Sequence, residues 1–143
     1  LKLQNKYGLT NYLATNTITI PEIIVPKVLH DNMDIILAGP IPPNPAELLS
    51  SEKLKGLIDE LKQTYDYIIL DTAPVGLISD TFNFAYISDM TIYVCRANYT
   101  TKDNIRYANT LVQNNRLKKM SFVINATNAK QGYGYGYGNK NAQ

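Results

Sequence analysis

Three short runs of apolar and β-branched residues constrain most strongly what this chain can fold into. They are DYIILD at 66–71, TIYVC at 91–95 and SFVIN at 121–125. Short, nearly continuous apolar runs are typical of strands that are covered on both faces, as in a parallel sheet. Because helix-like patterns precede and separate the runs, the order helix, strand, helix, strand, helix, strand predicts right-handed βαβ units in an α/β fold.

The clearest helix pattern is NPAELLSSEKLKGLIDELKQTY, at 44–65. Asn44 can cap this helix, Pro45 suits its first position, and Glu47 is placed to complete a capping box, so one helix is predicted to start there. Its apolar stripe consists of Leu54, Leu57, Ile58 and Leu61.

Two further helices are predicted, one over 81–87 with Asp80 as N-cap and one that Thr100 and Asp103 cap. The second would carry Ile105, Ala108, Leu111 and Val112 on one face. Upstream, VPKVLHDNMDIILAG predicts two extended pieces around a polar turn at 30–32, and PIPPNP predicts a stiff loop.

The composition describes one globular domain. The chain has 143 residues, 45% of them hydrophobic, and a net charge of +2, which gives no support to nucleic acid as a partner. With no apolar run near 18 residues, the chain is expected to be soluble, and its start without methionine suggests an excised piece of a longer protein. One histidine and one cysteine exclude a zinc site of nitrogen and sulfur ligands, so any metal would be a hard, oxygen-bound ion. Cys95 is predicted to be a buried, inert thiol.

Asp71 is the first candidate for chemistry. It follows four apolar strand residues, and ligands of open parallel sheets bind beyond the carboxyl ends of the strands. An aspartate there can orient Mg²⁺ directly or through its waters. The alternative is a loop aspartate that caps the next turn.

A family resemblance joins these signals. The succession KYGLTNYL, AGPIPPNPAELL, YDYIILDTAPVGLISD, IYVCR and VINA, followed by a tyrosine-rich end, resembles the C-terminal two-thirds of a bacterial tyrosine kinase domain, from about residue 6 to the tail. The resemblance implies a P-loop ATPase fold of the deviant-Walker type, with a mostly parallel sheet in three layers. It also implies a division into a partial kinase domain at 1–127 and a flexible Gly/Tyr-rich tail at 128–143.

The same resemblance implies roles for single residues. Asp71 matches the Walker B aspartate that helps place Mg²⁺ on ATP, and Asn125 matches an asparagine that contacts adenine in related ATPases. For Asn125 the alternative is a polar residue that turns the chain out of a strand. Arg96 also leaves a strand at the ligand edge, either as a nucleotide contact or as an ordinary surface arginine.

The tail sequence QGYGYGYGNKNAQ contains Tyr133, Tyr135 and Tyr137. By itself it is typical of a disordered chain end. The resemblance instead implies that these tyrosines are phosphoacceptors, which neighbouring subunits of a ring phosphorylate in one another. The other eight tyrosines, Tyr67 and Tyr93 within strands among them, are predicted to pack in the core or on the surface and not to accept phosphate.

The implied activity is that of an autokinase that uses Mg-ATP and regulates capsular and exopolysaccharide synthesis and export. The implied partners are neighbouring kinase subunits, an inner-membrane regulator of polysaccharide chain length and a protein-tyrosine phosphatase, and the implied location is the cytoplasmic face of the inner membrane. The sequence contains no G-x-x-x-x-G-K-[ST] loop, so this chain alone is expected to be inactive. Two alternatives stay open: a deviant-Walker ATPase without kinase activity, and a non-catalytic, pseudokinase-like interaction module.

Overall fold

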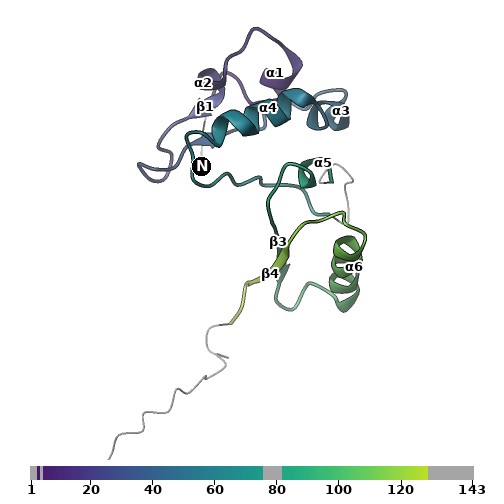
Figure 1. The fold of residues 1–143 in the computed structure, drawn as a ribbon. Helices are drawn as coiled ribbons and strands as arrows, with labels where there is room; N and C mark the ends of the chain where they lie inside the picture. The colour runs from purple at the N-terminus through teal and green to yellow at the C-terminus, as the bar shows by residue number, and fades with distance from the viewer. Residues whose placement is uncertain (1–2, 4, 76–81, 129–143) are drawn as a thin grey trace, which may run out of the picture. The chain divides into compact units, whose positions relative to one another are not determined.

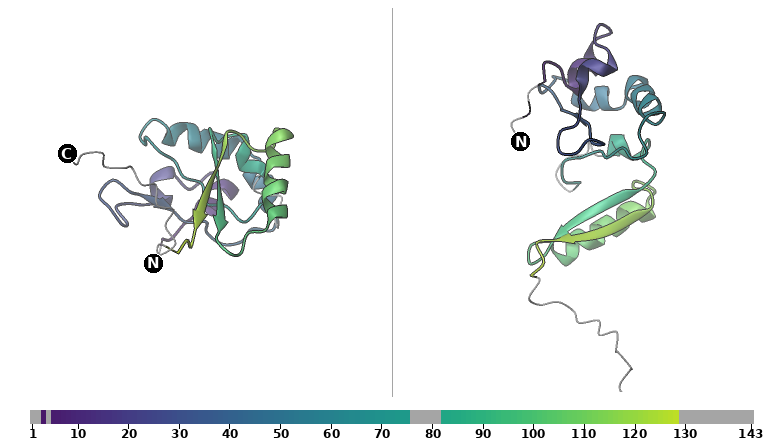
Figure 2. Two further views of the ribbon diagram at one scale, coloured as in Figure 1. Left: turned by 90° about the horizontal axis from the view of Figure 1, so that it is seen from below. Right: turned by 90° about the vertical axis from the view of Figure 1, so that its left-hand side faces the viewer.

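The computed structural model describes residue 3, residues 5–75 and residues 82–128, and the chain forms two compact units, Leu1–Asp89 and Met90–Gln143. Figure 1 labels the helices and strands, and Figure 2 shows them in two further views. In the described part of the chain, no helix has the length and apolar character that a bilayer crossing requires.

The first unit combines short helices with a small hairpin. The strands β1 (Ile24–Val25) and β2 (Ile35–Ile36) pair antiparallel, with Ile24 opposite Ile36. Between them the N–H of Met33 donates to the carbonyl of His30 at 3.0 Å, which closes a turn. The two predicted extended pieces around a polar turn are therefore confirmed. The helices of this unit are α1 (Leu9–Ala14), α2 (Ile20–Ile23), α3 (Pro45–Leu49), α4 (Glu52–Leu61) and α5 (Phe82–Ala85).

The single helix predicted from residue 44 is wrong, because the chain breaks between α3 and α4. Ser51 has an extended backbone, and its hydroxyl accepts the N–H of Leu54 at 3.3 Å, which makes it the N-cap of a new helix. The predicted capping box of Asn44 and Glu47 is also absent. The Asn44 amide instead donates to the Glu47 carboxylate at 2.7 Å, side chain to side chain.

The predicted stripe of α4 forms the core of the first unit. Leu54, Leu57, Ile58 and Leu61 are all buried, together with Leu13 of α1 and Ile23 of α2. At about 25 cal/mol per Å² of apolar surface, burial of this stripe is the main force that holds α4 in place.

Two glycines bring distant segments of the first unit into backbone contact. A Cβ on Gly8 would lie 2.5 Å from the backbone nitrogen of Gly39, and Gly39 has a φ of +84°. The N–H groups of Leu9 and Thr10 donate to the carbonyls of Leu37 and Ala38 at 2.8 and 2.9 Å. Glycine is therefore required where α1 begins against the end of the hairpin.

The strand predicted at 66–71 is not formed among the described residues. The segment has no ladder partner there, although its side chains alternate as in a strand. Ile68 and Leu70 pack on the core, whereas Tyr67 and Ile69 are each 88% exposed. A strand needs a neighbour to pair with, and an apolar run by itself supplies none. The helix α5 lies within the range predicted for 81–87, and its predicted cap, Asp80, lies outside the described residues.

The second unit is a parallel βαβ arrangement. Strand β3 (Thr91–Arg96) pairs in parallel with β4 (Met120–Asn125), and α6 (Lys102–Gln113) connects them. Cys95, Ala108, Leu111 and Leu117 are buried. The predictions for both strands, for the apolar face of α6 and for a buried Cys95 are confirmed here.

Candidate functional site

Two of the predicted site residues meet at the carboxyl edge of the parallel pair. Arg96 ends β3, Asn125 ends β4, and the register sets these two residues opposite each other. Side chains of directly paired residues lie on the same face of a sheet. The rule that ligands sit beyond the carboxyl ends of parallel strands therefore applies to both residues at one place.

A tight turn after β3 holds Arg96. The hydroxyl of Thr100 accepts the backbone N–H of Arg96 at 2.8 Å, and the carbonyl of Arg96 accepts the N–H of Thr100 at 2.9 Å. Within this turn Asn98 adopts a left-handed φ of 59°, and the Arg96 guanidinium lies 5.7 Å from the centre of the Tyr99 ring. An arginine over an aromatic ring is held by attraction to the π-face.

The Tyr99 ring itself is 76% exposed at this edge. Sequence reasoning did not select Tyr99. An aromatic residue just past a strand end, next to Asn98 in a polar turn, was the available signal.

One hydrogen bond orients the Asn125 side chain. Its Oδ1 accepts the backbone N–H of Ala126 at 2.7 Å, and Ala126 takes a left-handed φ of 56°. The side-chain oxygen is thereby used inside the protein, which leaves the Nδ2 amino group as a donor. The exposed Asn125 amide is suited to bind a group that accepts hydrogen bonds.

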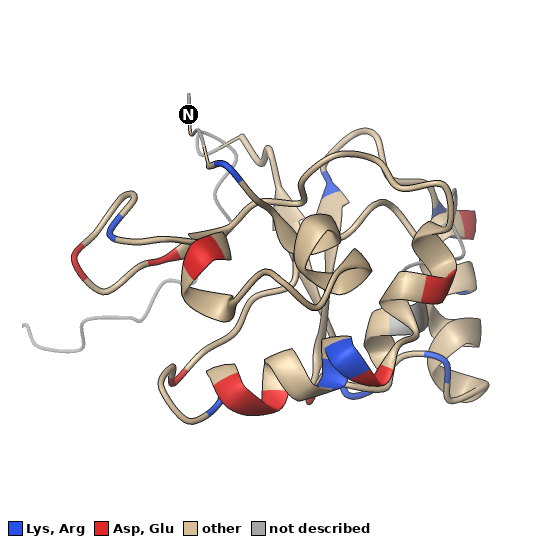
Figure 3. Ribbon diagram, turned by 90° about the horizontal axis from the view of Figure 1, so that it is seen from above, with Lys and Arg blue, Asp and Glu red and all other residues tan. Residues whose placement is uncertain are grey.

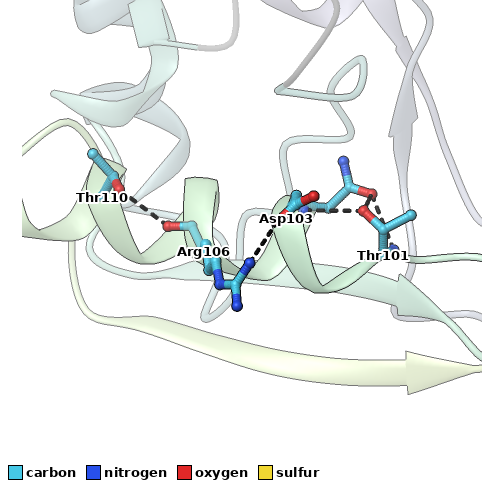
Figure 4. Close-up of polar contacts among 5 residues, drawn as sticks. Thr101, Asp103, Arg106 and Thr110 are labelled. Carbon is cyan, nitrogen blue, oxygen red and sulfur yellow. Dashed lines mark hydrogen bonds and ion pairs between the residues drawn. The ribbon is translucent and has the colours of Figure 1, made fainter.

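Helix α6 starts directly after this edge (Figure 4). Thr101 is its N-cap and shares a reciprocal capping box with Asn104, with bonds of 3.1 and 3.2 Å. The prediction that Thr100 and Asp103 form the cap is wrong, since the Thr100 hydroxyl is engaged with Arg96 and Asp103 instead contacts Arg106 at 2.8 Å.

Asp71 belongs to the first unit and follows the extended residues 66–70. Its side chain is exposed, and it makes no hydrogen bond or ion pair with another described residue. Within the described ranges no three His, Cys, Asp or Glu side chains gather as metal ligands. Asp71 is thus a single hard oxygen donor. This fits Mg²⁺, which binds through one or two carboxylates and keeps waters and phosphate oxygens as its other ligands.

The three tail tyrosines, Tyr133, Tyr135 and Tyr137, lie outside the described residues. Among the others, Tyr93 packs as predicted, edge-on to Phe122 with ring centres 5.5 Å apart, and burial raises the pKa of its hydroxyl. Tyr67 does not pack as predicted, because 88% of it is exposed.

Several bacterial proteins named as tyrosine-protein kinases are similar to this chain in sequence. No family model matches the chain. It is 33% identical over 124 residues to the tyrosine-protein kinase CpsD of Streptococcus agalactiae serotype III, which covers 85% of the chain and 51% of that protein. It is 31% identical over 123 residues to the tyrosine-protein kinase YwqD of Bacillus subtilis, over 86% of the chain and 51% of that protein. The chain spans about half the length of these curated relatives.

Solved structures agree with the sequence relatives. The chimerical protein CapA2B2 superposes with a TM-score of 0.75 at 31% identity, over 85% of this chain and 53% of that one. The kinase domain of VpsO gives the same TM-score and identity, over 87% of this chain and 60% of that one. Together with the parallel β3–α6–β4 unit, these likenesses confirm the predicted α/β fold class.

Proposed function

This chain belongs to the family of bacterial tyrosine-protein kinases, and we propose that it forms part of a longer autokinase that transfers the γ-phosphate of ATP to its own tyrosines. The kinship over more than four-fifths of the chain is the observation that carries this proposal. The phosphate-binding loop that the printed sequence lacks would come from the remaining half of such an enzyme.

The residues of this chain have distinct parts in that proposal. Asp71 helps to hold Mg²⁺, which neutralises charge on the transferring phosphoryl group when it is bound. The Nδ2 amino group of Asn125 donates a hydrogen bond to a ring nitrogen of adenine. An unprotonated ring nitrogen can only accept hydrogen bonds, so a donor is the group that it needs. Arg96, held beside Tyr99, lies at the same edge and adds positive charge for the nucleotide.

The tail supplies the phosphoacceptors, Tyr133, Tyr135 and Tyr137. A glycine-rich tether of this kind behaves as a flexible coil, which suits a segment that must enter the active site of a neighbouring subunit. We further propose regulation of capsular or exopolysaccharide export at the inner membrane. The partners would be neighbouring kinase subunits, a membrane regulator of chain length and a tyrosine phosphatase.

The first test is autophosphorylation of the complete protein with Asp71→Asn. Loss of a metal-holding carboxylate should lower the rate by at least about tenfold, which corresponds to about 1.4 kcal/mol of barrier. Asp66→Asn is the matched control, because it removes an exposed carboxylate from the other end of the same segment. Equal rates for both variants and the wild type would remove Asp71 from the site.

The second test replaces Tyr133, Tyr135 and Tyr137 by Phe, with Tyr67→Phe as a control that removes the hydroxyl of an exposed tyrosine elsewhere in the chain. Phosphotyrosine measured by mass spectrometry should disappear from the triple variant and persist in the control. ATP hydrolysis without phosphotyrosine in the wild type would instead favour an ATPase without kinase activity.

Calorimetry of the 143-residue chain alone should give no heat with Mg-ATP, because Asp71 offers one metal contact and no phosphate cradle.

A further inference from the structure

Charge is distributed very unevenly along the chain. Residues 1–89 contain six basic and eleven acidic residues, a net charge of −5, whereas residues 90–143 contain eight basic residues and one acidic residue, a net charge of +7. The modest total of +2 conceals this difference. The second unit is therefore strongly cationic, and a cationic face attracts anionic partners.

Three of these cations lie in one turn, between α6 and β4. Arg116, Lys118 and Lys119 are exposed, and the residue among them, Leu117, is buried and anchors the turn. The N–H groups of Arg116 and Leu117 donate to the carbonyl of Leu111 at 2.8 and 3.3 Å. The turn is thus a fixed part of the fold that presents three positive charges.

This turn lies away from the carboxyl edge of the parallel pair, where the nucleotide is proposed to bind. Because β3 and β4 are parallel, α6 must carry the chain back from the carboxyl end of β3 to the amino end of β4. Residues 114–119 therefore lie at the amino edge, the end opposite Arg96 and Asn125. The register Thr91 opposite Met120 brings the preceding residues, Met90 and Lys119, to this same edge, and Met90 is 51% exposed.

We propose that this amino edge, formed by Arg116, Lys118, Lys119 and Met90, is a docking surface for an anionic lipid bilayer. Clustered lysine and arginine residues bind acidic headgroups, and an exposed apolar side chain beside them inserts at the headgroup boundary. This proposal rests on the membrane location given under the proposed function and names the surface that would contact the bilayer. Binding of this surface to lipid does not depend on phosphoryl transfer.

Two other anionic partners fit the surface less well. On the first unit, charges of both signs follow one another along α4 (Figure 3), so this helix offers no continuous acidic face to a second copy of the chain. For single-stranded nucleic acid, stacking needs an exposed aromatic ring, and Tyr99, the most exposed aromatic residue described in this unit, lies at the opposite edge.

The test is sedimentation of the 143-residue chain with vesicles, without nucleotide. Vesicles that contain phosphatidylglycerol should bind the chain, pure phosphatidylcholine vesicles should not, and binding should weaken as NaCl is raised. The variant Arg116→Gln/Lys118→Gln/Lys119→Gln should lose roughly 100-fold in partitioning, at about fivefold for each cation. The matched control Lys55→Gln/Lys62→Gln/Lys102→Gln loses the same charge from other exposed positions and should bind nearly as the wild type does.

Circular dichroism of both triple variants excludes unfolding as the cause of a loss. Equal losses in the two variants would mean attraction by total charge alone and would overturn the proposal. It would also be overturned by absence of binding to anionic vesicles, or by tighter binding to single-stranded DNA. Salt-dependent self-association that the turn variant abolishes without vesicles would assign the surface to a second copy instead. Because no step needs ATP, failure here leaves the proposed kinase function untouched.

Discussion

A glycine in the middle of α4, Gly56, offers a direct test of which side of this helix faces solvent. Gly56 is exposed within the helix, and a Cβ built on it meets no heavy atom within 4 Å. Glycine in a helix interior is less favourable than alanine by about 0.8–1.0 kcal/mol, because it loses more conformational freedom on folding. Gly56→Ala should therefore stabilise the first unit by up to about 1 kcal/mol, while the packing around the helix stays as it is.

The expected shift is large enough to measure. For a unit of the size of residues 1–89, a gain of about 1 kcal/mol in the free energy of unfolding corresponds to a rise in Tm of about 4–8 °C. Thermal and urea unfolding followed by circular dichroism should both report it, since α4 contributes the largest share of the buried core of its unit.

The same substitution at Gly8 provides a matched control of opposite sign. There a Cβ would lie 2.5 Å from the nitrogen and 2.6 Å from the Cα of Gly39, so backbone must move, and overpacking of this kind costs about 1–3 kcal/mol. Gly8→Ala should thus lower the Tm while Gly56→Ala raises it. If Gly56→Ala also lowers the Tm, something covers that side of α4 and the reasoning is wrong.

Two further outcomes follow from side-chain hydrogen bonds. Thr101→Ala removes the N-cap of α6, which accepts the N–H of Asn104, and should cost about 1 kcal/mol in unfolding experiments, whereas Thr101→Ser should keep most of it. The hydroxyl of Tyr65 first, and then the backbone N–H of Lys27, lower the pKa of the Asp34 carboxyl below its usual value. This bond therefore stabilises the fold above the unfolded pKa near 3.9 and is lost as the pH falls through the folded pKa. Tyr65→Phe should lower the urea midpoint at pH 7 but differ little from wild type at the acid end; an undiminished difference there would contradict the assignment.

The second unit was predictable because its signals are local. The two apolar runs, the amphipathic pattern between them and the rule for parallel strands together predict that Arg96 and Asn125 emerge at one edge. Their detailed chemistry was not predictable. Whether the Asn125 amide presents its oxygen or its nitrogen to a ligand depends on the hydrogen bond that Oδ1 accepts from the backbone N–H of Ala126. Ala126 has a left-handed backbone, a conformation that the sequence does not predict for alanine.

The first unit deviates from its sequence pattern for two physical reasons. Good helix-forming residues stand on both sides of Ser51, with Leu48 and Leu49 before it and Leu54 after it, so one helix was predicted across the cap that splits α3 from α4. The paired serines at 50 and 51, followed by Glu52, were the available signal for a new N-terminus. The run at 66–71 has the composition of a strand, but pairing is a property of two segments, and the described residues supply only one.

At high concentration, the unpaired run at 67–70 offers other molecules a ready edge. Tyr67 and Ile69 are exposed on a backbone that pairs with no other described segment, the combination that templates intermolecular β-pairing. Asp66 and Asp71 bracket the run, and charges in such flanking positions repel a second copy of the same segment. Asp71 thereby carries two tasks in one carboxylate, the proposed metal contact and protection of the chain against aggregation. Replacing Asp71 by a neutral residue removes one of the two flanking negative charges that oppose β-pairing between copies of the run at 67–70.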